Sequence, residues 1–244
     1  MQKILAQLRR AVNDFKMISD GDKIAVGLSG GKDSLTMLAA LKAYSRFSPE
    51  RFSLSAVTVD MGLPDTDLSP LEEYCRSIEV PYNVVKTELY EIIFNIRKEK
   101  NPCSLCSKMR RGALNNAITA MGINKLALGH HADDVTETFL LSLFYEGRLS
   151  AFQPASLMDR SGVTLIRPMI YLAEKDIRAY SKNLPVIHNP CPANHATQRE
   201  YMKKLLKTIQ KDIPFCKDRV FGAICHPERN NLWRDAKEPE INED

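Results

Sequence analysis

The sequence lacks any apolar run close to the ~20 residues that a membrane-spanning helix requires, so no membrane span is expected. It also lacks internal repeats and low-complexity segments. Neither sign of charge is in large excess: the net charge of +4 mildly favours an anionic partner without identifying it. Residues 1–17 place apolar side chains at helical spacing among Gln, Arg, Asn and Asp, which predicts an amphipathic helix rather than a signal peptide. We therefore expect a cytoplasmic protein.

At 244 residues the chain can bury a substantial core, and one main domain with an appendage is expected rather than two equal domains. Apolar runs alternate with helical patterns as far as about residue 170, which predicts an α/β fold: a parallel sheet with helices on both faces. The expected strands cover residues 23–28, 52–59, 82–85, 125–129 and 163–166. The expected helices cover residues 33–44, 69–78, 108–121, 133–145, 174–183 and 197–211. The predicted parts are an N-terminal helix over residues 1–20, an α/β domain over 21–171 and a helical C-terminal extension over 172–244.

The most informative segment is a glycine-rich turn with the sequence GLSGGKDS over residues 27–34, directly after the apolar run 24–26. Backbone N–H groups at the start of the following helix would carry partial positive charge, and Lys32 would add a mobile one, so the turn suits phosphate. The usual nucleotide P-loop has four residues between its first glycine and its Gly-Lys pair, whereas three residues separate Gly27 from Gly31. The turn is instead similar to the pyrophosphate loop of enzymes that cleave ATP between its α and β phosphates. An ordinary strand–helix turn is the weaker alternative.

Two cysteines, Cys103 and Cys106, are spaced to ligate one metal centre together, and Cys191 between two prolines is a third candidate. In a cytoplasmic protein thiols or metal ligands are expected rather than disulfides, and the pair fits a redox couple, a zinc half-site or an iron–sulfur half-site. A structural zinc site without an open position needs four protein ligands, whereas three thiolates with an open position suit a [4Fe–4S] cluster. We favour the cluster. The candidates for a fourth ligand are His188, His195, Cys225 and His226. The cysteines expected to be structural are Cys75, Cys216 and Cys225.

A second strand–turn–helix motif covers residues 126–138 and is rich in histidine and carboxylate groups. Acidic residues in the first turn of a helix favour its macrodipole, and for Asp134 and Glu137 this structural role is as well supported as a functional one. Together with His130, His131 and Asp133, however, they stand at the carboxyl end of a strand in a sheet that already holds a phosphate loop. Such groups could hold magnesium or move a proton.

From residue 22 to about residue 233 these motifs resemble the bacterial tRNA 2-thiocytidine synthetases, the TtcA-like branch of the pyrophosphate-loop ATPases. The resemblance rests on residues 29–34, 59–62, 102–111, 129–138, 167–169, 174–177 and 190–191. It implies an adenine nucleotide α-hydrolase-like fold that uses ATP, Mg²⁺ and a [4Fe–4S] cluster. It also implies tRNA as substrate, a sulfur donor that is either sulfide or a cysteine desulfurase system, and a homodimer.

The family's chemistry, carried over to matching positions, gives each motif a role. ATP would adenylate the C2 oxygen of a cytidine in the anticodon loop, and sulfide on the unique iron would then displace AMP. The implied phosphate ligands are Ser29, Gly30, Gly31, Lys32, Asp33 and Ser34. Adenine would lie near Val59, Asp60 and Gly129, and the cluster on Cys103, Cys106 and Cys191. The catalytic candidates are Lys32 to offset charge on the pyrophosphate, Asp133 to handle substrate or magnesium, and Arg110 to orient the base.

Three other functions stay open at this point. A 2-thiouridine synthetase would use the same chemistry on another base, although the paired cysteines of its zinc ribbons are absent. A ligase of the lysidine synthetase type needs no cluster, so the cysteines argue against it. A non-catalytic zinc or redox nucleic-acid-binding protein leaves residues 29–34 unexplained. The lysines of helix 197–211 suit either an RNA contact or a solvated face; they are Lys203, Lys204, Lys207 and Lys211.

Overall fold

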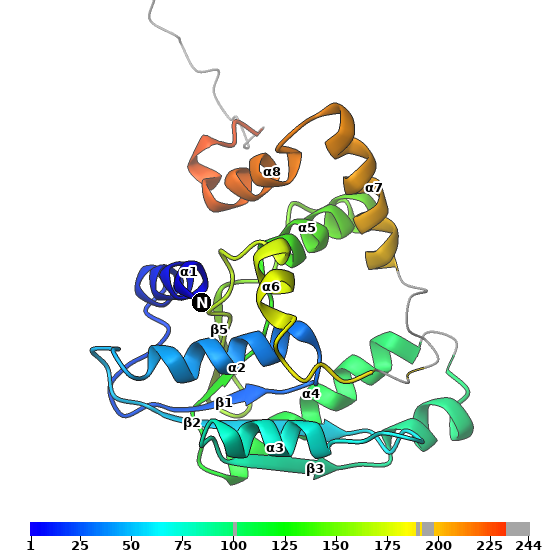
Figure 1. Cartoon of the computed structure of the whole chain (residues 1–244). Helices are drawn as coiled ribbons and strands as arrows, with labels where there is room; N and C mark the ends of the chain where they lie inside the picture. The colour runs from blue at the N-terminus through cyan, green and yellow to red at the C-terminus, as the bar shows by residue number, and fades with distance from the viewer. Residues whose placement is uncertain (100–101, 189–190, 192–197, 233–244) are drawn as a thin grey trace, which may run out of the picture.

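The structure is a computed structural model of the whole chain, and it describes residues 1–99, 102–188, 191 and 198–232. Its centre is a six-stranded sheet with the strand order β3-β2-β1-β4-β6-β5 (Figure 1). The strands are β1 (Lys23–Gly27), β2 (Ser53–Asp60), β3 (Tyr82–Lys86), β4 (Lys125–Ala127), β5 (Ala155–Met158) and β6 (Val163–Ile166). All neighbouring strands pair in parallel except β5, which runs antiparallel to β6 at one edge. The predicted parallel sheet is therefore confirmed.

Helices pack on both faces of this sheet, as predicted. They are α1 (Gln2–Asp14), α2 (Lys32–Tyr44), α3 (Ser69–Ser77), α4 (Pro102–Ala120), α5 (Ala132–Glu146), α6 (Glu174–Ser181), α7 (Gln198–Asp212) and α8 (Cys216–Cys225), with a π-helix over Glu91–Ile96 and a 3-10 turn over Pro227–Arg229. Alternate residues of β1 point to opposite faces of the sheet. Ile24 and Val26 belong to the core under α1 and α2, whereas Ala25 belongs to the core under α4. Along the described part of the chain, no helix has both the length and the apolar character needed to cross a bilayer.

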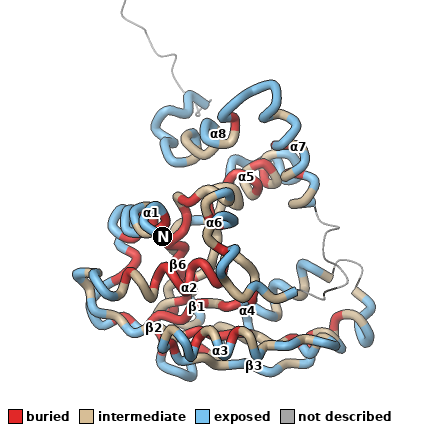
Figure 2. The backbone as a smooth tube through the Cα atoms, viewed as in Figure 1, coloured by how far each residue is buried: buried red, intermediate tan, exposed pale blue. Residues whose placement is uncertain are grey.

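The main core is continuous from the N-terminal helix to the sheet. Leu8 and Val12 of α1 are buried together with most residues of α2 (Figure 2). The predicted N-terminal helix thus shares the core of the α/β domain, and the predicted domain boundaries stay a prediction. Cys75 is fully buried in this core, which confirms its structural role. The helices α7 and α8 pack on α5, on the side that faces away from the sheet (Figure 1).

Four elements differ from the sequence-based expectation. The edge strand β5, the π-helix and α8 were not predicted, and α4 begins at Pro102 instead of residue 108. Proline is well tolerated at the first position of a helix, where its missing N–H would have no partner within the helix. As a result, Cys103 and Cys106 lie on the first turns of α4 rather than in a loop.

The sheet order fixes where a ligand can bind. The chain runs outward from β1 through β2 to β3 and then returns to β4 on the other side of β1. Ligands of open parallel sheets bind outside the carboxyl ends of the strands at such a reversal point. The glycine-rich turn follows β1 and the second motif follows β4, so both stand at this crevice.

Candidate functional site

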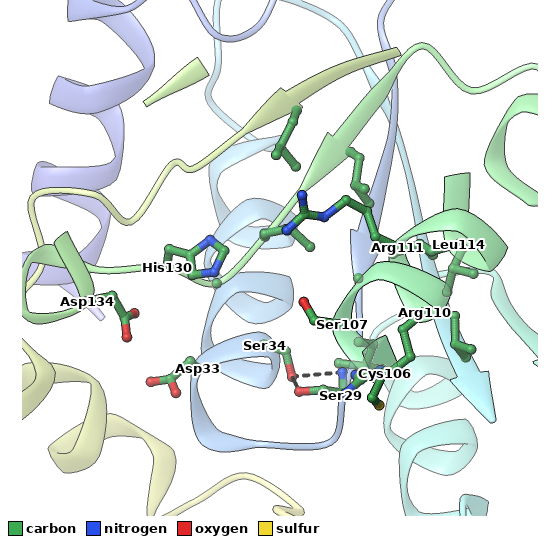
Figure 3. Close-up of a pocket in the computed structure, with 18 of the residues that line it drawn as sticks. Ser29, Asp33, Ser34, Cys106, Ser107, Arg110, Arg111, Leu114, His130 and Asp134 are labelled. Atoms are coloured by element: carbon green, nitrogen blue, oxygen red, sulfur yellow. Dashed lines mark hydrogen bonds between the residues drawn. The ribbon is translucent and has the colours of Figure 1, made fainter. Parts of the chain in front are cut away.

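A cavity of about 540 Å³ opens at the carboxyl ends of β1, β2 and β4 (Figure 3). Its volume lies within the ~300–1,000 Å³ typical of small-molecule sites. Its functional lining residues are Ser29, Asp33, Ser34, Val57, Val59, Cys103, Cys106, Arg110, Arg111, Gly129, His130, Asp134 and Cys191. The glycine-rich turn and the three cysteines predicted to bind a metal centre therefore line the same cavity.

The glycine-rich turn is shaped by its own hydroxyl groups. The Oγ of Ser34 accepts from the N–H of Ser29 at 3.1 Å and donates to the carbonyl of Gly31 at 3.0 Å. Gly30 adopts φ +77°, in the left-handed region that favours glycine. Gly31 stands at the N-cap of α2 without a side chain to cap the helix, which leaves the N–H groups of the first turn to a bound anion.

Lys32 is held by two carboxylates and does not line the cavity. Its Nζ lies 2.8 Å from Asp33 and 3.1 Å from Glu174 at the start of α6. Burial alone would lower the pKa of Lys32, but these two carboxylates outweigh it and raise that pKa. Burial opposes the charge on Glu174 as well, yet Lys32 and Arg178 lower the pKa of Glu174 to about 2. No role was predicted for Glu174, although it is the first residue of the segment 174–177 that contributes to the family resemblance.

The two aspartates at the start of α5 face different cavities. Asp134 lines the main cavity and accepts from the N–H of His131 at 3.0 Å, which caps the helix. Asp133 lines a second cavity of about 420 Å³ and accepts from Lys217 at 2.9 Å and from the N–H of Glu174 at 2.7 Å. These partners lower the pKa of Asp133 in spite of its burial. The structure thus brings Asp134, rather than the predicted Asp133, to the main cavity.

Two histidines connect the motifs. His131 is buried, and its Nε2 lies 3.4 Å from Asp134 and 3.6 Å from Asp33, so it sits between the two strand–turn–helix motifs. His130 lines the cavity, and its Nδ1 accepts from the Nε of Arg167 at 3.1 Å. Burial lowers the pKa of His130 to about 4, so this ring is neutral at pH 7.

The three cysteines of the predicted metal set are brought together at the cavity. Cys103 is exposed, Cys106 and Cys191 are half-buried, and the Sγ of Cys106 lies 3.6 Å from the Sδ of Met61. Burial raises the pKa of the Cys106 thiol, and the guanidinium of Arg110 partly opposes this shift.

Of the candidates for a fourth ligand that lie among the described residues, none lines the cavity. His188 is exposed, and Cys225 lies in α8. His226 instead pairs with Glu228 at 2.9 Å, and His195 lies outside the described residues. Across residues 1–99, 102–188, 191 and 198–232, no three His, Cys, Asp or Glu side chains are arranged to hold a single metal ion. Three thiols at the cavity, with no fourth ligand among the described residues, fit an iron–sulfur cluster with one open position better than a four-ligand zinc site.

Helix α7 reaches toward the site with part of its basic face. Arg199 lies 3.4 Å from both Asp134 and Glu137, and Lys203 lies 3.7 Å from Glu174 and 3.9 Å from Glu137. Glu137 is buried, which raises its pKa to about 7. Lys203 therefore points inward toward these carboxylates, rather than to solvent with the other lysines of α7. The exposed lysines of α7 are Lys204, Lys207 and Lys211.

Residues 1–208 match the model of the family described as PP-loop domain. The chain is 39% identical over 235 residues to the tRNA-cytidine(32) 2-sulfurtransferase of Citrifermentans bemidjiense, covering 94% of this chain and 92% of that protein. It is 42% identical over 230 residues to the protein of that name from Pseudomonas aeruginosa, covering 91% and 84%. Among solved structures, the U34-tRNA thiolase NcsA from Methanococcus maripaludis with its [4Fe–4S] cluster superposes with a TM-score of 0.77 at 24% identity, covering 98% of this chain and 85% of that one. At this identity the likeness shows the fold.

Proposed function

Because this chain belongs to the PP-loop family and, within it, to the tRNA-cytidine(32) 2-sulfurtransferases, we propose that it uses ATP to replace the C2 oxygen of cytidine 32 in tRNA with sulfur. The observation that carries the proposal is that one cavity is lined by both the glycine-rich turn and the three cysteines. Activation of an oxygen and delivery of sulfur to the same carbon require such proximity.

In the activation half, the C2 oxygen of the base attacks the α-phosphate of ATP, and pyrophosphate leaves. The N–H groups of residues 29–34 would bind the phosphates, while Val57, Val59 and Gly129 would form the wall against adenine. Asp60 does not line the cavity, and its carboxylate accepts from the N–H of Gly62 at 2.9 Å. Lys32 would exchange Asp33 and Glu174 for the departing pyrophosphate and stabilise its charge.

In the sulfur half, the C2 carbon gains sulfur and AMP leaves with the former C2 oxygen. Cys103, Cys106 and Cys191 would hold a [4Fe–4S] cluster, which when bound supplies an iron without a protein ligand for the delivery of sulfide. Arg110 and Arg111 line the same cavity and would orient the adenylated base through its phosphate. The neutral ring of His130, held by Arg167, adds no positive charge beside them.

We propose that Mg²⁺ arrives with ATP. Magnesium is usually bound by one or two carboxylates together with substrate phosphates, and Asp33 and Asp134 both line the cavity. Asp133 would act indirectly, by fixing Lys217 and the start of α6. The remaining expectations are proposals too: sulfide or a cysteine desulfurase system as donor, a homodimer, and action in the cytoplasm.

The experiment is thiolation of bulk tRNA by the anaerobically reconstituted protein with ATP, magnesium and sulfide, followed by nucleoside mass analysis. We expect 2-thiocytidine from the wild type and none from Cys191→Ser, which removes a thiol that lines the cavity. The control Cys225→Ser should also form 2-thiocytidine, because Cys225 lies in α8 and does not line the cavity. Appearance of 2-thiouridine instead would change the target base and keep the chemistry. An unmodified pool, with ATP bound and the cluster intact by its visible spectrum, would contradict the proposal.

A further inference from the structure

The segment that leads to Cys191 packs directly on the glycine-rich turn. The N–H of Ile187 donates to the carbonyl of Gly30 at 3.1 Å. A Cβ atom added to Gly30 would lie 2.5 Å from the Cδ1 of Ile187 and closer still to its Cγ1. The side chain of Ile187 therefore fills the space that any residue other than glycine would need at this point of the turn.

The same segment contacts the turn at its other end. Glu174 begins α6 and lies 3.1 Å from Lys32, whereas Ile187 follows α6 and contacts Gly30. Between them, α6 packs against α2, the helix that the turn opens. Leu184 and Ile187 also pack on the main hydrophobic core, which anchors the segment. Residues 174–188 thus form a brace that touches the turn at two of its expected phosphate ligands, Gly30 and Lys32.

The brace ends three residues before the third cysteine. Ile187 and Cys191 are four residues apart, so their Cα atoms are separated by at most about 14 Å. Cys191 in turn lines the cavity together with Ser29 of the turn. We propose that Ile187 is a positioning residue that couples the occupancy of the glycine-rich turn to the placement of the Cys191 thiol.

This coupling rests on the proposed function, because it assumes that ATP binds the turn and that Cys191 belongs to the thiol set. Its physical basis is the hydrogen bond from the Ile187 N–H to the Gly30 carbonyl, through which a change of the turn on phosphate binding would displace Ile187. Coupling free energies are reciprocal. If ATP changes the thiol site, then a filled thiol site changes the affinity for ATP by the same factor.

The test uses the cluster-free full chain without tRNA, so that it does not depend on turnover. The rate at which iodoacetamide alkylates Cys191 is measured by peptide mass, with and without saturating ATP, and Cys103 and Cys225 are followed in the same samples. The variants are Ile187→Ala, Ile187→Val as the conservative replacement, and Val186→Ala as the matched control. Val186 is the neighbouring residue and is 47% exposed. Binding of ATP is measured separately by calorimetry.

We expect ATP to change the Cys191 rate at least about 5-fold in the wild type, in Val186→Ala and in Ile187→Val. In Ile187→Ala the change should fall below about 2-fold while ATP still binds. An undiminished ATP effect in Ile187→Ala would show direct shielding by the nucleotide and would overturn the proposal, as would no effect in the wild type with ATP bound. Failure of ATP to bind the wild type at all would instead contradict the proposed function.

Discussion

Gly129 offers the sharpest test of how the two motifs share one site. It follows β4, and a Cβ atom at this position would lie 2.9 Å from the carbonyl carbon of Asp33, 3.0 Å from its oxygen and 3.1 Å from the nitrogen of Ser34. All three atoms belong to the backbone of the first turn of α2, so no side-chain rotation can relieve the contact. The substitution Gly129→Ala must therefore separate the end of β4 from the glycine-rich turn.

The expected size of the effect follows from these distances. Ordinary contacts between carbon atoms begin near 3.5 Å, so the backbone must give by about 0.5 Å. Overpacking of this kind typically costs about 1–3 kcal/mol. If the strain falls on the phosphate-binding form of the turn, ATP should bind about 5- to 150-fold more weakly.

Isothermal titration calorimetry with ATP measures this directly, and thermal unfolding reports any loss of global stability. Gly222→Ala is the matched control, because Gly222 lies in α8 with no atom within 4 Å of an added Cβ. That variant should bind ATP as the wild type does. Wild-type affinity in Gly129→Ala would refute the close approach of the two motifs.

The remaining predictions concern charged groups. Lys32→Ala should slow pyrophosphate release at saturating ATP by about 100- to 1,000-fold, because a donor aimed at developing charge is lost; a wild-type rate would remove Lys32 from the mechanism. Burial raises the pKa of Glu137 from 4.5 to about 7, so the native state holds a proton that the unfolded chain releases, and the free energy of unfolding should fall as the pH rises between these values. Glu137→Gln should flatten this fall, which amounts to at most about 3 kcal/mol, in denaturant titrations near pH 5 and pH 8; an unchanged slope would refute it. For tRNA binding, the slope of log affinity against log salt concentration should decrease in magnitude by about 2–3 when three exposed lysines of α7 are replaced by alanine. An unchanged slope would exclude this face of α7 from contact with tRNA. The three lysines are Lys204, Lys207 and Lys211.

Local patterns in the sequence were sufficient for every strand of the sheet except β5, and for the turn. Strand β1 and helix α2 are read from consecutive apolar residues, and the turn between them from its glycines and Lys32. The predicted helix began six residues too late, at residue 108, although Pro102 is a favourable first residue of a helix.

Contacts between distant segments could not be predicted in this way. The ion pair of Lys32 with Glu174 joins residues on α2 and α6. The periodicity of one helix does not predict which residues of the other helix it contacts. Lys203 looks like its exposed neighbours in sequence, yet the buried carboxylate of Glu137 draws it inward. The contact of Ile187 with Gly30 likewise depends on tertiary packing.

The central claim is that ATP activates the C2 oxygen of the base and that this oxygen leaves with AMP. The most direct measurement uses a tRNA transcript whose cytidines carry ¹⁸O at C2, incubated anaerobically with the reconstituted protein, ATP, magnesium and sulfide. Mass spectrometry then follows AMP and 2-thiocytidine together. The account predicts one ¹⁸O atom in AMP for each 2-thiocytidine formed. AMP without ¹⁸O, formed alongside 2-thiocytidine, would contradict adenylation of the base.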